Sequence, residues 1–161
     1  MIKSMYNHAP INYACPICCA VNGIENDETW IKQGDIFYRD DFILGFISSK
    51  KIKGNDGHAL IVPVKHFENI YELPDEYGHK IFEIAKRVAR AMKQTRACDG
   101  VTLLQNNEPA GDQHAFHYHL HVIPRFQNDN FHEELWKTEK CDANDRFAHA
   151  EALRTSLKIF F

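Results

Sequence analysis

Three histidines alternate with apolar residues in the run His117-Tyr118-His119-Leu120-His121-Val122. Side chains in a β-strand point alternately to opposite faces, so the run predicts a strand with three imidazoles on one face and a core-facing apolar side on the other. Imidazole titrates nearest to neutral pH. Neighbouring imidazoles would lie about 6.5–7 Å apart, two strand steps of about 3.3 Å. This spacing predicts a site that holds a phosphate group or a metal ion.

A second motif whose residues could bind a metal or react is Cys15-Pro16-Ile17-Cys18. Alone, it is compatible with half of a zinc site, a redox pair or no chemistry. A redox pair should open a helix after a buried strand, and the residues before Cys15 do not have a strand pattern. A closed zinc site needs two further ligands. Among the ten histidines, His66 and one member of the histidine strand are the best placed.

Polar residues that could assist these histidines lie in two other segments. Asn106 and Gln113 flank a polar loop before the histidine strand, and their amides could hold phosphate oxygens or orient a leaving group. Alone, the same residues would be read as a turn-forming Asn and a solvated Gln. His58 opens a buried strand, where it is either a core histidine or a partner that orients another imidazole.

The elements that must position these residues follow an α+β pattern with an antiparallel sheet. One long amphipathic helix starts at Pro74 and repeats apolar residues at helical spacing, with Gly100 as its stop signal. We expect an N-terminal arm (1–14), a domain (15–126) and a C-terminal tail with a helix (127–161) in the same unit. Strands are expected at 35–40, 42–47, 58–63, 101–105 and 116–123, a loop at 48–57, and a tail helix at 145–158 with Phe147, Ala150, Leu153 and Leu157 on one stripe.

Composition narrows the class of protein. The chain has 161 residues and a formal net charge of −3, which argues against nucleic-acid binding through bulk positive charge. It contains no apolar run of membrane-spanning length, and its N-terminus lacks the apolar segment of a signal peptide. An odd number of cysteines argues against a disulfide framework. We therefore expect a cytoplasmic protein with reduced thiols, in which Cys98 and Cys141 carry no chemistry.

The chain resembles the histidine triad (HIT) family of nucleotide hydrolases and transferases. The resemblance rests on the alternating run from His117 to Ile123, on Gln113 and Asn106 upstream of it, on the segment from Gly57 to His66, and on the early Cys-x-x-Cys. It implies an α+β, HIT-like fold that assembles as a homodimer.

The resemblance also implies roles for the polar residues. His119 would attack the α-phosphorus of a nucleotide and form a covalent nucleotidyl-imidazole that water then cleaves. His121 would bind the phosphate oxygens, and a backbone carbonyl just beyond the triad strand would orient His119. Gln113 would steady the bridging oxygen or the leaving group. Asn106 and His58 would support the phosphate and the imidazole network.

Zinc-bearing members of the family are similar to this chain in their cysteines and histidines. Carried over, their ligands are Cys15, Cys18, His66 and His117, a set that suits tetrahedral zinc. The metal would be structural and would leave His119 and His121 free for chemistry. Cys19 is the less favoured ligand because Cys15 and Cys18 have the usual spacing.

Three departures from the family pattern bear on specificity. The acidic residue that binds the ribose hydroxyls in many members is absent here, because its place falls near Ile47-Ser48-Ser49. His114 stands where Ser or Thr is common, so it is either a general acid for the leaving group or an exposed side chain. The third triad position is His121 and not the Gln of the transferase branch, which favours hydrolysis.

The leading hypothesis is thus an enzyme, a zinc-bearing hydrolase that acts on nucleoside phosphoramidates or dinucleoside polyphosphates. The alternative is a zinc-stabilised nucleotide-binding or regulatory module with little turnover. A third interpretation places a catalytic metal on the histidine strand. The expected partners are a small-molecule nucleotide and a second copy of the chain, with neither nucleic acid nor membrane.

Overall fold

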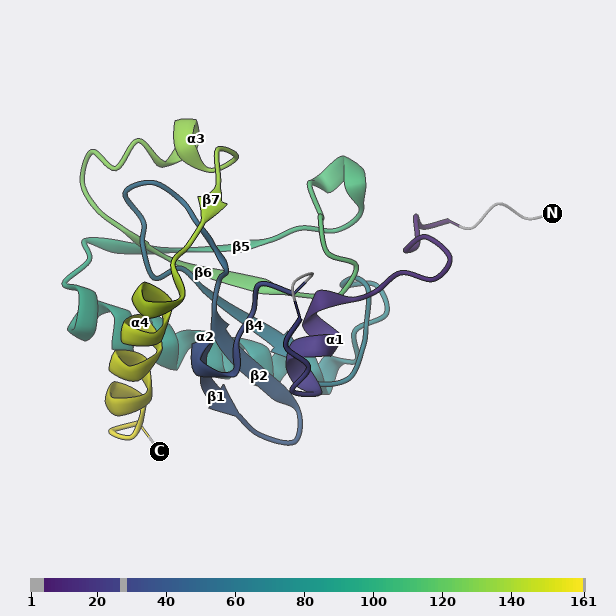
Figure 1. The fold of residues 1–161 in the computed structure, drawn as a ribbon, viewed down its shortest axis with the longest axis horizontal. Helices are drawn as coiled ribbons and strands as arrows, with labels where there is room; N and C mark the ends of the chain where they lie inside the picture. The colour runs from purple at the N-terminus through teal and green to yellow at the C-terminus, as the bar shows by residue number, and fades with distance from the viewer. Residues whose placement is uncertain (1–4, 27–28, 161) are drawn as a thin grey trace.

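The chain folds as a strand-rich first half, a long helix, two further sheet strands and a tail helix. The computed structural model describes residues 5–26 and 29–160 (Figure 1). The helices are α1 (Pro16–Val21), α2 (Asp75–Arg96), α3 (Phe131–Glu134) and α4 (Ala143–Leu157), with short 3-10 turns at Gln33–Asp35 and Pro109–Gly111. The strands are β1 (Ile36–Arg39), β2 (Ile43–Ile47), β3 (Lys50–Lys51), β4 (Ala59–Pro63), β5 (Gly100–Gln105), β6 (Leu120–Arg125) and β7 (Glu139–Lys140).

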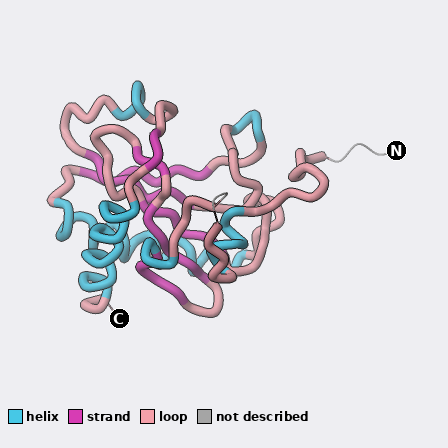
Figure 2. The backbone as a smooth tube through the Cα atoms, viewed as in Figure 1, coloured by secondary structure: helices cyan, strands magenta, loops and turns pink. Residues whose placement is uncertain are grey.

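Five of the strands form one antiparallel sheet in the order β1-β2-β4-β6-β5. Strands are drawn in magenta in Figure 2. The short strands β3 and β7 pair separately, with Lys50 opposite Lys140. The predicted fold class, an α+β protein with an antiparallel sheet, one long amphipathic helix and a tail helix, is confirmed.

Helix α2 forms where the sequence places a start signal before an apolar stripe. Pro74 precedes the helix, and Asp75 and Glu76 put negative charge in its first turn. The helix ends earlier than predicted, because Ala97 adopts a left-handed conformation (φ 47°) and Gly100 already belongs to β5. The buried stripe of the helix packs on the sheet and consists of Ile81, Ile84, Ala85, Val88, Ala91 and Met92.

Helix α4 packs against α2 at one end of the sheet (Figure 1). Its buried stripe begins with Arg146, whose guanidinium lies 3.0 Å from the Asp35 carboxylate, and both side chains are almost fully buried. The prediction that Phe147 belongs to the core stripe is wrong, since its side chain is 51% exposed. Arg146 can take the inward position because the Asp35 carboxylate compensates its buried charge.

Two local predictions around the site are also corrected. The predicted histidine strand 116–123 is shorter and shifted, since β6 begins only at Leu120 and continues through Pro124 to Arg125. The Tyr118 amide donates to Phe67 O at 2.6 Å, so this stretch is bonded to the loop after β4 and not to a sheet neighbour. The predicted loop 48–57 contains the two-residue strand β3, because this segment pairs with the distant tail.

Within residues 5–26 and 29–160, no helix combines the length and the apolar character needed to cross a membrane.

Candidate active site and metal centre

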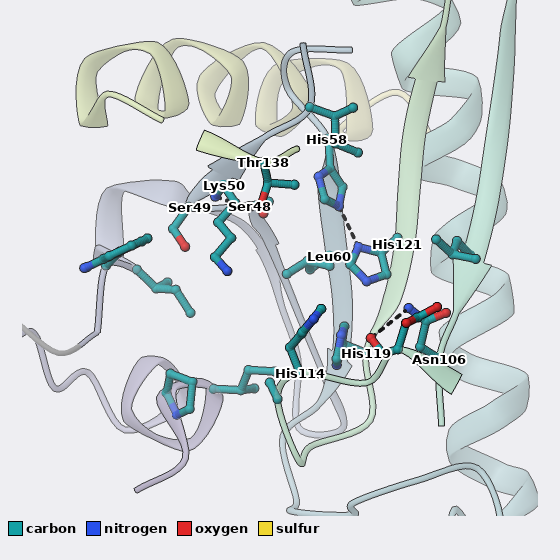
Figure 3. Close-up of a pocket in the computed structure, with 18 of the residues that line it drawn as sticks. Ser48, Ser49, Lys50, His58, Leu60, Asn106, His114, His119, His121 and Thr138 are labelled. Carbon is teal, nitrogen blue, oxygen red and sulfur yellow. Dashed lines mark hydrogen bonds between the residues drawn. The ribbon is translucent and has the colours of Figure 1, made fainter. Parts of the chain in front are cut away.

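A cavity of about 400 Å³ opens on the sheet beside β4 and β6, and predicted site residues line it. His121 faces it from β6, His119 lies directly before β6, and His58 lies directly before β4 (Figure 3). His114 and Asn106 come from the loop that precedes β6. The fold thus brings five of the predicted polar residues to one cavity.

His119 is oriented by a backbone carbonyl. Its Nδ1 lies 2.7 Å from His117 O, and a carbonyl oxygen can only accept, so Nδ1 carries the proton. In a neutral ring the lone pair is then on Nε2. The acceptor carbonyl lies two residues before His119, so the prediction that it lies just beyond the strand is wrong. The bend that precedes β6 turns this carbonyl toward the ring.

His58 and His121 form a direct imidazole pair. His58 Nε2 lies 2.6 Å from His121 Nδ1, so one ring donates and the other accepts (Figure 3). Gly57 permits this placement, because it has a φ of +77° and a Cβ there would lie 2.2 Å from the Arg96 guanidinium. The expectation that His58 contacts another imidazole is confirmed by this geometry.

Burial keeps these imidazoles uncharged. It lowers the pKa of His58 to about 4, lowers the pKa of His119, and lowers the pKa of His121 well below the usual value. Repulsion between the rings adds to the effect for each of them. A neutral imidazole has the free lone pair that nucleophilic attack requires.

The predicted loop residues differ in their access to the cavity. Asn106 donates from Nδ2 to Asp112 O at 3.3 Å and lines the cavity (Figure 3). His114 is exposed and also lines it, with its ring 6.5 Å from the ring of Trp136. Gln113 does not line it. Its amide is buried and bonded to the Glu108 amide at 2.7 Å and to the carbonyls of Glu68 and Ala115.

The second constellation lies next to this cavity and contains the four predicted metal ligands. The side-chain donors of Cys15, Cys18, His66 and His117 all lie within 4.8 Å of one another. His117 Nδ1 is 3.5 Å from both sulfurs, and His66 Nδ1 is 3.2 Å from Cys18 Sγ. Among the described residues, Cys19 is not part of this group.

The protonation of His117 fits a metal-binding role. Its Nε2 donates to Pro63 O at 2.9 Å, which leaves the lone pair of the neutral ring on Nδ1, facing the sulfurs. Tetrahedral zinc, with Zn–S of about 2.3 Å and Zn–N of about 2.0–2.1 Å, would hold S and N atoms about 3.5 Å apart. The two distances from His117 Nδ1 to the sulfurs, both 3.5 Å, match this value, and the distance from His66 Nδ1 to Cys18 Sγ is shorter, at 3.2 Å. Burial raises the pKa of the Cys15 thiol to about 12, a penalty that a bound cation would offset.

Several residues that line the cavity were missed by sequence reasoning. They come from the segment before β1, from the segment after β2 and from the tail. Of the positions in these segments, only the place of Ser48 and Ser49 was connected from the sequence with a possible role, in ribose recognition. Two features of the sequence could have indicated the missed residues. One is the lysine that directly follows two serines, and the other is the tryptophan in the polar tail. The missed residues include Trp30, Lys50, Leu135, Trp136 and Thr138.

Comparisons with known proteins agree with this geometry. The HIT domain profile matches residues 32–128. Protein hit of Bacillus subtilis is 34% identical over 105 residues, which is 65% of this chain and 71% of that protein. Adenosine 5′-monophosphoramidase HNT1 of Saccharomyces cerevisiae is 41% identical over 87 residues, which is 54% of this chain and 52% of that protein.

Among solved structures, a zinc-bound histidine triad family protein from Mycobacterium smegmatis is similar with a TM-score of 0.72. It is 26% identical, and the match covers 91% of this chain and 95% of that one. The segment matched by the domain profile runs from β1 to just beyond β6 and includes His58, His119 and His121.

Proposed function

The chain belongs to the HIT domain family, and from this premise we propose that it is a nucleotide hydrolase with His119 as its nucleophile. The substrate would be a nucleoside phosphoramidate or a dinucleoside polyphosphate, cleaved at the α-phosphate. The related yeast protein is named for activity on adenosine 5′-monophosphoramide, which supports the first of these classes.

The observation that carries the proposal is the hydrogen bond from His119 Nδ1 to His117 O. It fixes the tautomer in which Nε2 holds the lone pair, on a ring that lines the cavity. Burial lowers the pKa of His119, so the lone pair is available at neutral pH. A held and uncharged imidazole in a cavity is what nucleophilic attack on phosphorus requires.

The reaction would proceed in two displacements. In the first, His119 Nε2 forms a bond to the α-phosphorus while the bond from phosphorus to the leaving group breaks. His114, which lines the cavity, is placed to supply a proton to that group. In the second, water attacks the phosphorus and gives a proton back to His114, the P–N bond breaks, and His119 returns to its neutral form with release of the nucleoside monophosphate.

Other residues would bind the phosphate or position the loop. His121 would donate from Nε2 to a phosphate oxygen, which requires its Nδ1 to accept from His58 across the 2.6 Å contact. The Asn106 amide would bind a second oxygen from the opposite side. Gln113 would act as a positioning residue, because its amide holds the backbone of the loop that carries Asn106 and His114.

We also propose a structural zinc ion at Cys15, Cys18, His66 and His117. When bound, it would cross-link α1 to the segment before β6. The His117 carbonyl would be held by the same residue that ligates the metal, so the site would stiffen the hydrogen bond to His119. A homodimer belongs to the same proposal. It is supported by the outer position of β5 in the sheet, where Leu103 is 44% exposed.

His119→Ala tests the proposal directly. We expect kcat on adenosine 5′-phosphoramidate and diadenosine polyphosphates to fall at least about 10⁴-fold, because removing a nucleophile abolishes its pathway. The thermal unfolding midpoint should stay near that of the wild type. Intact-mass analysis of quenched wild-type protein should detect a nucleotidyl adduct that maps to His119.

The matched control is His79→Ala, because His79 is an exposed histidine on α2 and does not line the cavity. It should retain wild-type turnover. Nucleotide binding without turnover by the wild-type protein would replace the hydrolase with a binding module. Full activity of His119→Ala would show that the proposed mechanism is wrong. Light scattering coupled to size exclusion would test the dimer separately.

A further inference from the structure

One lysine in the wall of the cavity has no part in the proposed reaction. Lys50 begins β3 and is exposed, and its side chain extends toward the space between Ser49 and His114 (Figure 3). Asn106 lies on the far side of His114 and His119 in the same view. Lys50 therefore adds a positive charge to the cavity on the side away from the Asn106 amide, which would bind the α-phosphate.

The charge of Lys50 has no counter-ion among the described residues. Its neighbour Lys51 points to the other side of the strand and lies 3.9 Å from the Glu139 carboxylate. Lys50 itself stands opposite Lys140 in the β3–β7 register, and like charges at opposed positions destabilise a strand pair. The Lys140 ammonium lies 5.0 Å from the ring of Trp30, another residue of the cavity wall. A bound anion would relieve this repulsion.

The groups around Lys50 are hydrogen-bond donors. Ser48, Ser49 and Thr138 line the same wall with their hydroxyls (Figure 3). Ser48 Oγ accepts from the Lys50 amide at 3.2 Å, which leaves its O–H free to donate. Asp112 is the acidic residue that lines the cavity in the described part of the chain, and its carbonyl is bonded to Asn106 at the other end. An ammonium group among hydroxyls suits phosphate oxygens.

We propose that Lys50, Ser48, Ser49 and Thr138 form a second anion subsite that binds a phosphate group other than the one His119 attacks. The inference rests on the proposed function and names its substrate class, a nucleotide with an additional phosphate. That phosphate is either on the ribose or further along a polyphosphate chain. The shared chemistry is the phosphate group itself.

The test compares substrates that differ by one phosphate. In the first arm, adenosine 5′-phosphoramidate is compared with its 3′-phosphorylated counterpart. In the second, diadenosine triphosphate is compared with diadenosine tetraphosphate. For each pair the readout is the ratio of kcat/KM, so a general loss of activity cancels.

We expect Lys50→Gln to lower this ratio by at least about tenfold in one or both arms, since a hydrogen bond to a charged group is lost. Lys50→Arg should keep most of the ratio. The matched control is Lys53→Gln, which removes the same charge from an exposed position that does not line the cavity. A change in the first arm alone assigns the subsite to a ribose phosphate, and a change in the second alone assigns it to the chain. Unchanged ratios in both arms overturn the proposal.

Binding separates this inference from the proposed function. Calorimetry on the His119→Ala protein should show tighter binding of adenosine 3′,5′-bisphosphate than of AMP, or of diadenosine tetraphosphate than of diadenosine triphosphate, and adding Lys50→Gln should abolish the preference. If the wild type binds with this preference but turns nothing over, the subsite stands and the hydrolase fails. If the wild type turns substrates over but Lys50→Gln changes neither preference, the subsite fails alone.

Discussion

The two ends of the cavity are held in place by different chemistry. Beside His119, the support is a cluster of two thiols and two imidazoles, the set Cys15, Cys18, His66 and His117. The loop that follows Lys50, at the other end, is tied through Asn55 to a carboxylate, that of Asp129. The first depends on soft ligands and, as we propose, on a metal. The second depends on charge and hydrogen bonds.

Asp129 organises its end through several donors. Its two oxygens face the Arg125 guanidinium at 2.7 and 2.9 Å. They also accept from the amides of Phe126 and Phe131 and from Asn55 Nδ2. Asn55 Nδ2 in turn reaches Pro124 O at 2.8 Å, so the loop that follows Lys50 is tied to the end of β6.

Because the two supports differ, metal removal and substitution of Asp129 should affect different residues of the cavity. A chelator would remove the proposed zinc from His117, whose carbonyl orients His119, so metal loss should reach the nucleophile directly. Substitution of Asp129 acts at the other end, because Asp129 contacts neither His119 nor His121 in the described structure. Perturbing one end and observing the other is therefore the sharpest test of this comparison.

The largest effect should follow from removing the metal end. We expect Cys15→Ser, or prolonged chelation, to eliminate the bound zinc. Closed zinc sites supply about 10–16 kcal/mol in small domains, and we expect at least about 3 kcal/mol of stabilisation here. For a chain of this size that corresponds to a fall in the thermal midpoint of about 6–12 °C. The measurements are metal analysis by mass spectrometry and calorimetric melting.

Cys19→Ser is the matched control, since Cys19 is adjacent to Cys18 but outside the cluster. It should keep its zinc and its midpoint. The comparison would fail if Cys15→Ser retained a stoichiometric metal, because the metal would then be bound elsewhere, for example at the histidines of the cavity.

A smaller effect is expected between the two ends, at Gln113. Gln113→Leu removes the amide that bonds Glu108 N, Glu68 O and Ala115 O, so the loop with Asn106 and His114 should loosen. We expect kcat to fall about tenfold, the cost of about 1.4 kcal/mol in the barrier. Because the amide is engaged with the backbone, the loss should be equal for good and poor leaving groups in a phosphoramidate series.

Gln127→Leu, at an exposed position outside the cavity, controls for loss of a glutamine amide. A loss that grows with the basicity of the leaving group would instead support the role implied by the family resemblance, direct contact between Gln113 and that group.

The metal end could be predicted from the sequence because its signals are local. Cys15 and Cys18 are three residues apart, and the alternation from His117 to His121 is visible in the sequence itself. The structure brings the four predicted ligands together and places His119 and His121 at the cavity. The start of β6 was mispredicted because alternation does not record that the Tyr118 amide bonds to Phe67 O.

The other end could not be predicted because it is assembled from distant segments. Lys50 and Thr138 line the same cavity because β3 pairs with β7, and this two-residue pairing has no periodicity to detect. In the sequence around Asp129, nothing distinguishes this residue from a solvated turn residue. Two of its hydrogen-bond donors are backbone amides, which residue types do not reveal. Its role follows from the folded geometry alone.

The smallest effect on turnover should come from Asp129, and the effect of this residue on stability should depend on pH. Five donors hold the pKa of the Asp129 carboxyl well below its usual range, chiefly the Arg125 guanidinium. The lowered pKa means that the carboxylate contributes stability above the unfolded value of about 3.9, and that this stability is lost as pH falls further. Asp129→Asn should cost about 2–3 kcal/mol at pH 7, the scale of a lost charged hydrogen bond.

The pH profile then separates the two ends. Urea unfolding at pH 7, 5, 4 and 3 should show the gap in unfolding free energy between wild type and Asp129→Asn shrinking below about pH 4, because the wild-type carboxyl loses its advantage as it protonates. The exposed Asp41, changed to Asn, should give no such trend.

At pH 7 Asp129→Asn should keep its zinc and most of its turnover, because the His117–His119 hydrogen bond lies at the other end of the cavity. If zinc were lost together with stability, the two supports would be a single cooperative unit and the comparison would not hold.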